Sequence, residues 1–299
     1  MAKILITGAS GRLGSSFVSR LDEVVSNEHE IYLLKRKNPI KFSQAKGFNY
    51  SIINSLPNSR EYDFAFHFAG NLHTSMGDPQ KNPENYPVFV RDNVELTKEV
   101  CDASSHVLFA STDNVFSGMD RRDYKEDDAP NPPNNFYGRT KALAEKVVLD
   151  KGGAAIRFQS PLGVSSSLIV DRIFDAIEGR PSWSFWNDQF IRPAFFGDML
   201  LAFKRIYQGK KQGIYHISCS GETPSRAEIA KKVLGIYKTY DIPRQKESIE
   251  EEPCNNPNFP RRLVLDTSYT RKELGIEKFT DVDEAIKIHV LRIKAPECL

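Results

Sequence analysis

The sequence predicts a doubly wound α/β protein built on a parallel sheet, and three observations carry this prediction. Short apolar runs alternate with longer stretches of helical periodicity through the first 160 residues. The strand-like runs are almost continuously apolar, as are parallel strands that helices cover on both faces. A glycine-rich turn joins the first expected strand to the first expected helix, where this fold needs a tight connection.

The individual elements follow from local patterns. Lys3–Thr7 is a β-branched run that stops at Gly8, and the residues after it carry apolar side chains at helical spacing. Compact apolar runs between polar turns mark the later strands. The expected strands are Lys3–Thr7, Glu30–Lys35, Tyr62–Phe68, His106–Ala110 and Ala154–Phe158. The expected helices are Arg12–Val25, Val88–Ala103 and Phe136–Leu149.

The strict alternation fades after Ser160, which indicates a second domain. We expect residues 1–160 to form the doubly wound domain, with a returning segment at about 190–220, and residues 161–299 to form a smaller α/β domain. The acidic run Glu247–Glu252 reads as a solvated loop. The second half is expected to contain a strand at Gly213–Ser218 and helices at Asp171–Gly179, Ser225–Tyr240 and Thr267–Leu274.

Composition excludes several classes of protein. The 299 residues carry a net charge of +2, which argues against wholesale binding to nucleic acid or to a membrane surface. No apolar run approaches the roughly 18 residues that span a bilayer, and Ile4–Ile6 is too short for a signal-peptide core. The four cysteines lack CxxC spacing, so we expect no metal site or disulfide framework and a reducing cytoplasm. A homodimer is allowed, although no residue pattern argues for it.

The glycine-rich turn predicts a phosphate-binding site. Gly8, Gly11 and Gly14 stand three residues apart between a strand and a helix. Glycine lets a pyrophosphate approach the backbone amides at the positive end of the helix. The candidate cofactor-binding residues in this turn are therefore Gly8, Ser10, Gly11, Arg12, Leu13 and Gly14, and residues 1–160 are expected to bind a dinucleotide.

The end of the second expected strand bears on which dinucleotide binds. An acidic residue there would hold the ribose 2′-hydroxyl of NAD, but the chain has Lys35-Arg36-Lys37. Cations suit the 2′-phosphate of NADP, with Arg36 as the candidate contact and Arg12 as a helper. NADP(H) is therefore favoured and NAD(H) stays open. The alternative is a basic edge in contact with solvent only.

A tyrosine and a lysine four residues apart form the candidate catalytic pair. Tyr137 and Lys141 share one face of an expected helix. An ammonium near the phenol would lower its pKa and make Tyr137 a usable proton donor or acceptor. Thr112 follows the strand His106–Ala110, and strand ends of a parallel sheet line the ligand crevice. A hydroxyl there can hold a carbonyl oxygen while Tyr137 donates a proton.

These motifs resemble those of the extended short-chain dehydrogenases/reductases, and within them the dTDP-4-dehydrorhamnose reductase branch. The resemblance covers essentially the whole chain. The segments that carry it in the first half are Thr7–Gly14, His67–Gly70, Asn93, Ser111–Gly118, Tyr124–Lys141 and Ile156-Arg157. Those in the second half are Asp188–Met199, Gly213–Ser218 and Arg261–Gly275.

The resemblance implies roles for particular residues. It implies that Thr112, Tyr137 and Lys141 form a catalytic triad, with Tyr137 and Lys141 also touching the cofactor. It also implies that Asn93 supports the lysine through ordered water. Ala69 and Gly70 are expected along the cofactor in the same way. Asp113 is expected to touch the sugar or to cap a turn, and Arg192 to hold the substrate's pyrophosphate.

The sequence departs from the branch near the expected sugar. The branch has a tryptophan shortly after the arginine that corresponds to Arg157, and this chain has none there. The branch also tends to have a small residue where Arg192 stands. His73 could face the substrate or be packed, and Trp183 and Trp186 could stack on a base or fill the core.

Three functions are weighed. The first is an NADP(H)-dependent reductase of a nucleotide-linked 4-keto-6-deoxy sugar. The second is a nucleotide-sugar epimerase or dehydratase. The basic cluster argues against an NAD-retaining epimerase, and Asp113-Asn114 lacks the Asp-Glu pair of a dehydratase. The third is a non-catalytic subunit, because the branch resembles the regulatory subunit of methionine adenosyltransferase.

Overall fold

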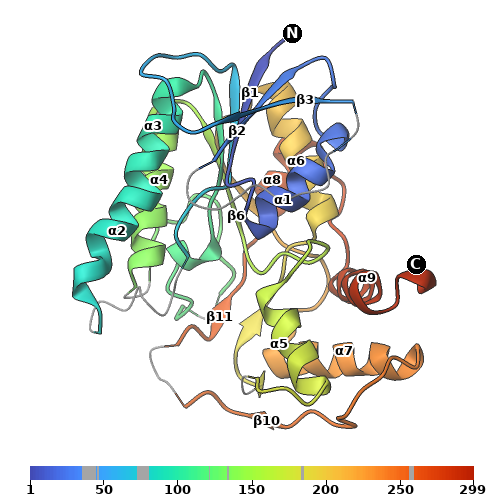
Figure 1. The fold of residues 1–299 in the computed structure, drawn as a ribbon. Coiled ribbons are helices and arrows are strands. Elements are labelled where there is room, and N and C mark those ends of the chain that lie inside the picture. Colours follow the sequence, from blue (N-terminus) through green and yellow to red (C-terminus); the bar gives the residue numbers. More distant parts are fainter. Residues whose placement is uncertain are drawn as a thin grey trace. The chain divides into compact units, whose positions relative to one another are not determined.

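The fold is described from a computed structural model, which covers residues 1–35, 45, 47–72, 81–120, 122–132, 135–182, 185–255 and 259–299 (Figure 1). Four residues singled out in the sequence lie outside this part of the chain. They are Arg36, Lys37, His73 and Trp183.

A seven-stranded sheet confirms the predicted fold class. Its strand order is β3-β2-β1-β4-β5-β6-β9, and the pairings recorded from β3 through to β6 are all parallel. This order places the first strand in the middle, as in doubly wound folds. The strands are β1 Lys3–Thr7, β2 Glu30–Leu34, β3 Asn49–Ile53, β4 Phe64–His67, β5 Val107–Ala110, β6 Ala154–Phe158 and β9 Gly213–Ile217.

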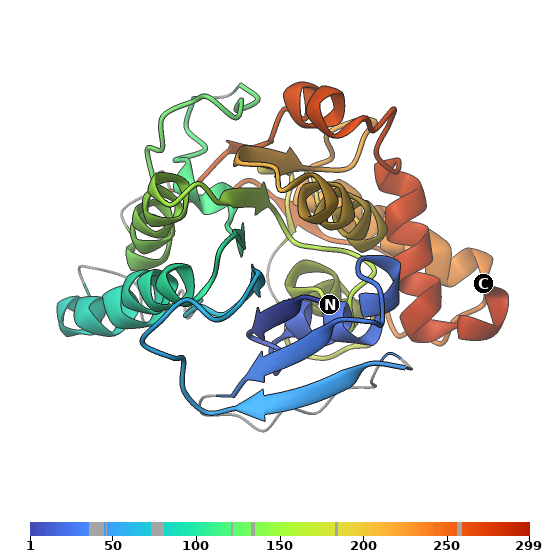
Figure 2. The same cartoon turned by 90° about the horizontal axis from the view of Figure 1, so that it is seen from above.

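Helices cover both faces of this sheet (Figure 2). On one face α3 (Leu96–Ala103) and α4 (Phe136–Asp150) pack against Leu5, Ala65 and Phe109. On the other face α1 (Arg12–Ser19) and α6 (Phe196–Gly209) meet β4 through aromatic rings, with Phe17 lying 4.7 Å from Phe66 and 5.7 Å from Phe203 between ring centroids. Burial on both faces explains why the interior strands β1, β4 and β5 are almost continuously apolar.

The chain forms two compact units. The first comprises residues 1–116, 126–157 and 199–215, and the second comprises residues 117–125, 158–198 and 216–299. The predicted domains 1–160 and 161–299, with a returning segment at about 190–220, remain a prediction about domain organisation.

The second unit has its own apolar core. Val170, Phe174, Val233, Tyr237 and Ile286 are among its buried residues. A capping box between Ser225 and Glu228 starts α7, because each side chain bonds the other residue's backbone N–H. Its helices are α5 Leu168–Ile177, α7 Arg226–Thr239, α8 Ser268–Leu274 and α9 Val282–Lys294. Its short parallel strand pairs are β7 Phe185–Trp186 with β10 Glu251–Glu252, and β8 Phe190–Ile191 with β11 Arg262–Leu263.

Several elements differ from the sequence-based expectation. The edge strand β3 was missed, because its sequence NYSII alternates polar and apolar residues and is largely exposed. The first helix ends at Ser19 and is followed by a 3₁₀ turn, Leu21–Glu23. The expected helix at 88–103 is α2 (Tyr86–Val90) and α3 joined by a π-helical turn. Two residues of the expected loop 247–252 pair as β10.

Within the described residues, no helix is long and apolar enough to cross a membrane. The same residues contain no group of three or more histidine, cysteine or acidic side chains that could hold a metal ion.

Candidate active site

The turn between β1 and α1 needs its glycines for steric reasons. Gly8 has a φ of +72°, in the left-handed region, and a Cβ there would lie 2.6 Å from the backbone N of Ala69. A Cβ on Gly14 would lie 2.2 Å from the carbonyl oxygen of Gly8. Gly11 donates its N–H to that same carbonyl at 2.8 Å and caps α1, which begins at Arg12. The turn thus brings the helix N-terminus close to the end of β1, an arrangement suited to a pyrophosphate.

The other predicted cofactor residues fall into two groups. Ser10 and Arg12 are exposed and Leu13 is half-buried, all at the start of α1. Ala69 and Gly70 follow β4, which is the neighbour of β1 in the sheet. Arg36 lies outside the described residues, so its predicted contact with a 2′-phosphate stays a prediction.

A chain of buried hydrogen bonds starts at this turn. Thr7 Oγ1 accepts from the Ala69 N–H at 3.2 Å and lies 2.6 Å from His67 Nδ1, while His67 Nε2 lies 2.9 Å from Thr97 Oγ1. Thr97 donates its only hydroxyl proton to the Asn93 carbonyl at 2.6 Å, so it accepts from His67. The proton of the His67 ring is therefore on Nε2, and Nδ1 accepts from Thr7.

The His67 ring is held neutral. Burial, with a smaller contribution from the nearby Lys141 charge, lowers the pKa of His67 to about 3. The direction of each hydrogen bond in the chain is therefore the same across the whole range of neutral pH. These hydrogen bonds connect the end of β1 to the segment that carries Asn93.

Asn93 lies in the π-helical turn Arg91–Glu95 and is almost fully buried. Its Nδ2 donates to Thr140 Oγ1 on α4 at 2.8 Å. A Cβ added to Gly70 would lie 3.0 Å from Asn93 Oδ1 and 3.9 Å from Lys141 Nζ. The buried Asn93 amide and the Lys141 ammonium thus both lie close to Gly70. Asn93 also belongs to a π-helical turn, an element that is frequent at functional sites.

Thr112 directly follows β5 and belongs to a tight turn. Its hydroxyl donates to Asp113 Oδ1 at 3.0 Å and accepts from the Asn114 N–H at 3.2 Å. Asn114 Nδ2 also donates to Asp113 Oδ1 at 3.0 Å. Both Thr112 and Asp113 are buried. The Asp113 carboxylate is engaged in holding this turn, and contact with a sugar stays a prediction.

Tyr137 is brought to Thr112 by the start of α4. Asn135 caps this helix by accepting the Gly138 N–H at 2.7 Å. A Cβ on Gly138 would lie 2.2 Å from the carbonyl oxygen of Asn114, so only glycine allows this close approach. The Tyr137 phenol forms a hydrogen bond with Thr112. Two of the three predicted catalytic side chains therefore meet directly.

The protonation of Tyr137 differs from the sequence-based expectation. Burial raises the pKa of Tyr137 to about 12, the hydrogen bond with Thr112 lowers it in part, and the Asp113 carboxylate raises it further. The sequence argument predicted a lowered pKa because of Lys141. Instead, burial and a nearby carboxylate decide the direction. A phenol that keeps its proton at neutral pH is suited to donating it.

Lys141 completes the predicted triad from the next turn of α4. Its Nζ donates to the Ala110 carbonyl at 2.5 Å and lies 3.8 Å from the centre of the Phe109 ring. Burial lowers the pKa of Lys141 to about 7, and the Glu145 carboxylate counteracts this shift. The lysine is therefore a buried cation, close to its titration point, held at the end of β5.

Arg192 lies in the second unit, directly after β8. Its guanidinium donates to Thr223 Oγ1 at 2.5 Å, and its buried Nε has no hydrogen-bond partner among the described residues. Burial lowers the pKa of Arg192. The Asp123 carboxylate raises this pKa, and the Arg262 charge lowers it further. An incompletely paired guanidinium can accept an anionic ligand.

Sequence reasoning gave no role to two buried polar groups. One is the hydrogen-bond chain through His67, although His67 had been noted within a family motif. The other is an ion pair between Glu145 and Arg157. Glu145 follows Lys141 by four residues, and Arg157 stands within the apolar strand run 154–158. A charge in an otherwise buried strand must be paired, so the position of Arg157 was the sequence signal for a buried ion pair.

The doubly wound sheet, the glycine turn, and the Thr112, Tyr137 and Lys141 side chains define a protein of the extended short-chain dehydrogenase/reductase class. The chain belongs to the RmlD substrate binding domain family, whose model matches residues 2–290. The resemblance drawn from the sequence motifs is thereby confirmed.

Comparisons with individual proteins agree with this membership. Over 95% of this chain and 86% of the relative, the sequence is 27% identical to methionine adenosyltransferase 2 subunit beta of Bos taurus. It is 28% identical to the dTDP-4-dehydrorhamnose reductase of Aggregatibacter actinomycetemcomitans over 73% of this chain and 74% of that protein. The structure matches dTDP-4-dehydrorhamnose reductase from Bacillus anthracis in complex with NADP with a TM-score of 0.74 and 18% identity, over 98% of this chain and 100% of that one.

Proposed function

We propose that the protein is an NADP(H)-dependent reductase of a nucleotide-linked 4-keto-6-deoxy sugar. The observation that carries this proposal is the hydrogen bond between Tyr137 and Thr112 at the end of β5, beside the buried Lys141. The names of relatives support it, because sugar-nucleotide reductases occur among both the sequence and the structural relatives.

The residues present fit a dinucleotide cofactor. Gly8 and Gly14 allow the tight turn that brings the start of α1 against the end of β1, because a Cβ on either would clash with neighbouring backbone. Gly70 lies beside Asn93 and Lys141, where a Cβ would come within 3.0 Å of Asn93 Oδ1. Gly8, Gly11 and Gly14 would hold the pyrophosphate, and Lys141 would donate to a ribose hydroxyl. When bound, the reduced nicotinamide supplies the hydride.

The chain's own groups then handle the oxygen of the ketone. Thr112 and Tyr137 present two hydroxyls that can both bond this oxygen. As the oxygen gains negative charge, Tyr137 transfers its phenolic proton to it. The Lys141 ammonium stabilises the phenolate that is left behind. The raised pKa of Tyr137 keeps this proton in place until substrate arrives.

The proposal also includes the choice of cofactor, the role of Arg192, the compartment and the oligomeric state. NADP(H) is favoured over NAD(H) because of the Lys35-Arg36-Lys37 cluster. Arg192 would bind the diphosphate of the substrate, because its buried Nε has no hydrogen-bond partner in the described part of the chain. The cytoplasm is the proposed compartment, in line with four free cysteines. A homodimer remains a prediction that sedimentation would measure.

The proposal is tested by following NADPH absorbance with a panel of nucleotide-linked keto sugars. Turnover of one of them is expected, and it should fall about 10²–10⁴-fold in Tyr137→Phe, the range that proton donation typically contributes. Tyr269→Phe is the matched control, because Tyr269 is about half exposed on α8. If Tyr137→Phe keeps most of the activity, Tyr137 is not the proton donor.

A second candidate is a non-catalytic subunit. It is favoured by the relatives that match 95% of this chain, which are beta subunits of methionine adenosyltransferase 2. A subunit of this kind would bind to another enzyme chain and would not consume NADPH. Co-sedimentation with a methionine adenosyltransferase, together with no turnover of any keto sugar, would favour this function over the reductase.

A further inference from the structure

A fully buried cluster of charges lies behind the candidate active site. Glu145 on α4 accepts two hydrogen bonds from Arg157 on β6, at 2.9 and 2.8 Å, and one from the Ser111 hydroxyl at 2.5 Å. Both charged side chains are only 3% exposed. The Arg157 guanidinium also lies 4.8 Å from the centre of the Phe116 ring. Glu145, Arg157, Ser111 and Phe116 all belong to the first unit.

The cluster is tied to two of the candidate catalytic residues. Ser111 directly precedes Thr112, so the carboxylate anchors the strand end from which the Thr112 hydroxyl projects. Glu145 follows Lys141 by one helical turn, which places both on one face of α4. The cluster therefore joins β6 to β5 and α4, the two elements that carry the predicted triad.

The surroundings of Lys141 make the charge of Glu145 important. The Ala110 carbonyl and the Phe109 ring contact the ammonium, and both are uncharged. Tyr137 on the same helix keeps its proton, and His67 on β4 is neutral because its pKa is about 3. The Glu145 carboxylate, one helical turn away on α4, favours the ammonium form of Lys141 and raises its pKa against the effect of burial.

We propose that Glu145 is a positioning residue for the candidate active site, where it anchors the strand end that carries Thr112 and keeps Lys141 in its ammonium form. This inference deepens the proposed reductase function and rests on it for the meaning of Thr112 and Lys141. Arg157 has the complementary task, because it lets a carboxylate stay ionised in a buried position.

The charge part of the proposal is tested by titrating Lys141 in the full-length protein. Nuclear magnetic resonance of carbon-labelled lysine side chains follows the titration, and Lys141→Met identifies the resonance. Glu145→Gln should lower the titration midpoint of Lys141 by about one pH unit or more, which is the usual effect of a nearby opposite charge. Asp150→Asn removes a carboxylate from an exposed position of the same helix and should leave the midpoint unchanged.

Two further variants separate this role from a merely structural one. Glu145→Asp keeps the charge and should keep the wild-type midpoint. Glu145→Leu combined with Arg157→Met removes both buried charges, so the protein is expected to fold. The Lys141 midpoint should still fall, but less than in Glu145→Gln, because the Arg157 cation is removed together with the carboxylate. An unchanged midpoint in the double variant overturns the proposal, even if Glu145→Gln alone fails to fold.

The anchoring part is tested through Ser111. Ser111→Ala leaves the charge of Glu145 in place, so the Lys141 midpoint should stay unchanged. With a keto sugar that the wild type reduces, kcat should fall about tenfold or more, because a misplaced Thr112 weakens contacts in the transition state, while KM changes little. An unchanged kcat overturns the anchoring role. If the wild type reduces no keto sugar, the proposed function fails, whereas the lysine titration still decides the role of the Glu145 charge.

Discussion

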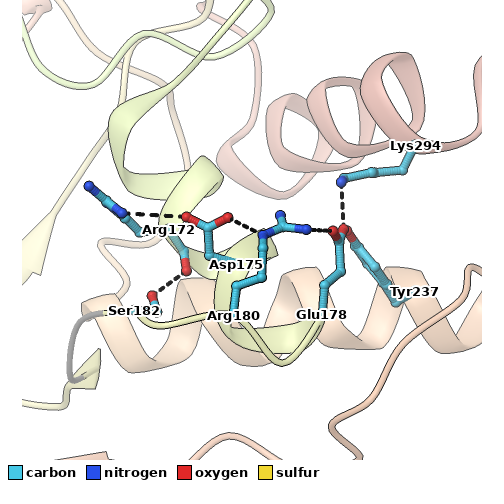
Figure 3. A network of polar contacts seen from close by, with 7 residues as sticks. All are labelled: Arg172, Asp175, Glu178, Arg180, Ser182, Tyr237 and Lys294. Carbon is cyan, nitrogen blue, oxygen red and sulfur yellow. Dashed lines mark hydrogen bonds and ion pairs between the residues drawn. The ribbon is translucent and has the colours of Figure 1, made fainter.

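Two clusters of charged side chains, one in each unit, show how burial changes what an ion pair does. In the first unit, Glu145 and Arg157 pair at 2.8 Å and are almost fully removed from solvent. In the second unit, Glu178 binds Lys294 at 2.5 Å and Arg180 at 2.7 Å, yet the Arg180 side chain is 53% exposed (Figure 3). The contact distances are similar, so geometry alone does not distinguish the two clusters. Exposure to water does.

The cluster in the second unit suits its place at a helix end. Glu178 follows α5, where the partial negative charge of the helix end disfavours a carboxylate. Lys294 from α9, Arg180 and the Tyr237 hydroxyl from α7 compensate by converging on it (Figure 3). Asp175 extends the network by binding Arg180 at 2.7 Å. These contacts link α5 with α7 and α9 at the surface, where water can replace any one of them.

The largest effect is expected when the buried pair loses one partner. Among the described residues, Arg157→Met leaves the buried Glu145 carboxylate with Ser111 as its remaining donor, which should cost about 3–5 kcal/mol of unfolding free energy. Urea unfolding measures this loss. The double variant Glu145→Leu, Arg157→Met should recover most of it, because neither charge is then stranded. A double variant as unstable as the single one would contradict the explanation by an unpaired charge.

A smaller effect is expected for a buried group that carries no charge. His67→Leu removes the ring that links Thr7 to Thr97 and leaves their hydroxyls short of a partner. The expected loss is about 1–3 kcal/mol by urea unfolding. Thr97→Val removes one of the hydroxyls that His67→Leu leaves without a partner. In the double variant it should therefore lower the unfolding free energy by less than it does when made alone in the wild type. Strict additivity of the two substitutions would show that the hydrogen-bond chain does not act as a unit.

Glu178→Gln in the surface cluster should have a modest effect, about 1 kcal/mol or less at neutral pH. Burial alone would raise the pKa of Glu178, but hydrogen bonds from Lys294, Tyr237 and Arg180 lower it below its usual value of 4.5. A lowered pKa in the folded state stabilises the protein above the unfolded value and is lost as pH falls through the folded value. The difference between wild type and variant should therefore shrink below about pH 4.5, the ordinary glutamate value. A difference that grows with acid would reverse the sign of this argument.

The smallest effect is expected for Arg180→Met. This side chain is largely exposed, and Lys294 and Tyr237 still bind Glu178 without it. The midpoint of urea unfolding should be indistinguishable from that of the wild type, and added salt should not change this result. A clear loss of stability would mean that the surface network is cooperative.

The candidate site was predictable from the sequence where its chemistry depends on spacing along the chain. The three glycines of the first turn and the Tyr137–Lys141 pair each lie within a few residues, so a motif records them. Thr112 was predicted because parallel strands end at one edge of a sheet, and its catalytic role stays a prediction. Whether Arg36 and Arg192 bind their expected phosphates stays a prediction.

The remaining properties depend on partners far apart in the sequence. Ser111 meets Glu145 across 34 residues, and Thr7 meets His67 across 60. The pKa of Tyr137 was predicted in the wrong direction, because the sequence shows the lysine nearby but not the loss of solvent around the phenol. The sequence by itself determined the parallel sheet, the glycine turn and the identity of the candidate catalytic groups, since periodicity and local sterics are written in neighbouring residues. Only the tertiary structure decided which of these groups are protonated and which buried charges hold them, because desolvation and long-range pairing arise when distant segments pack together.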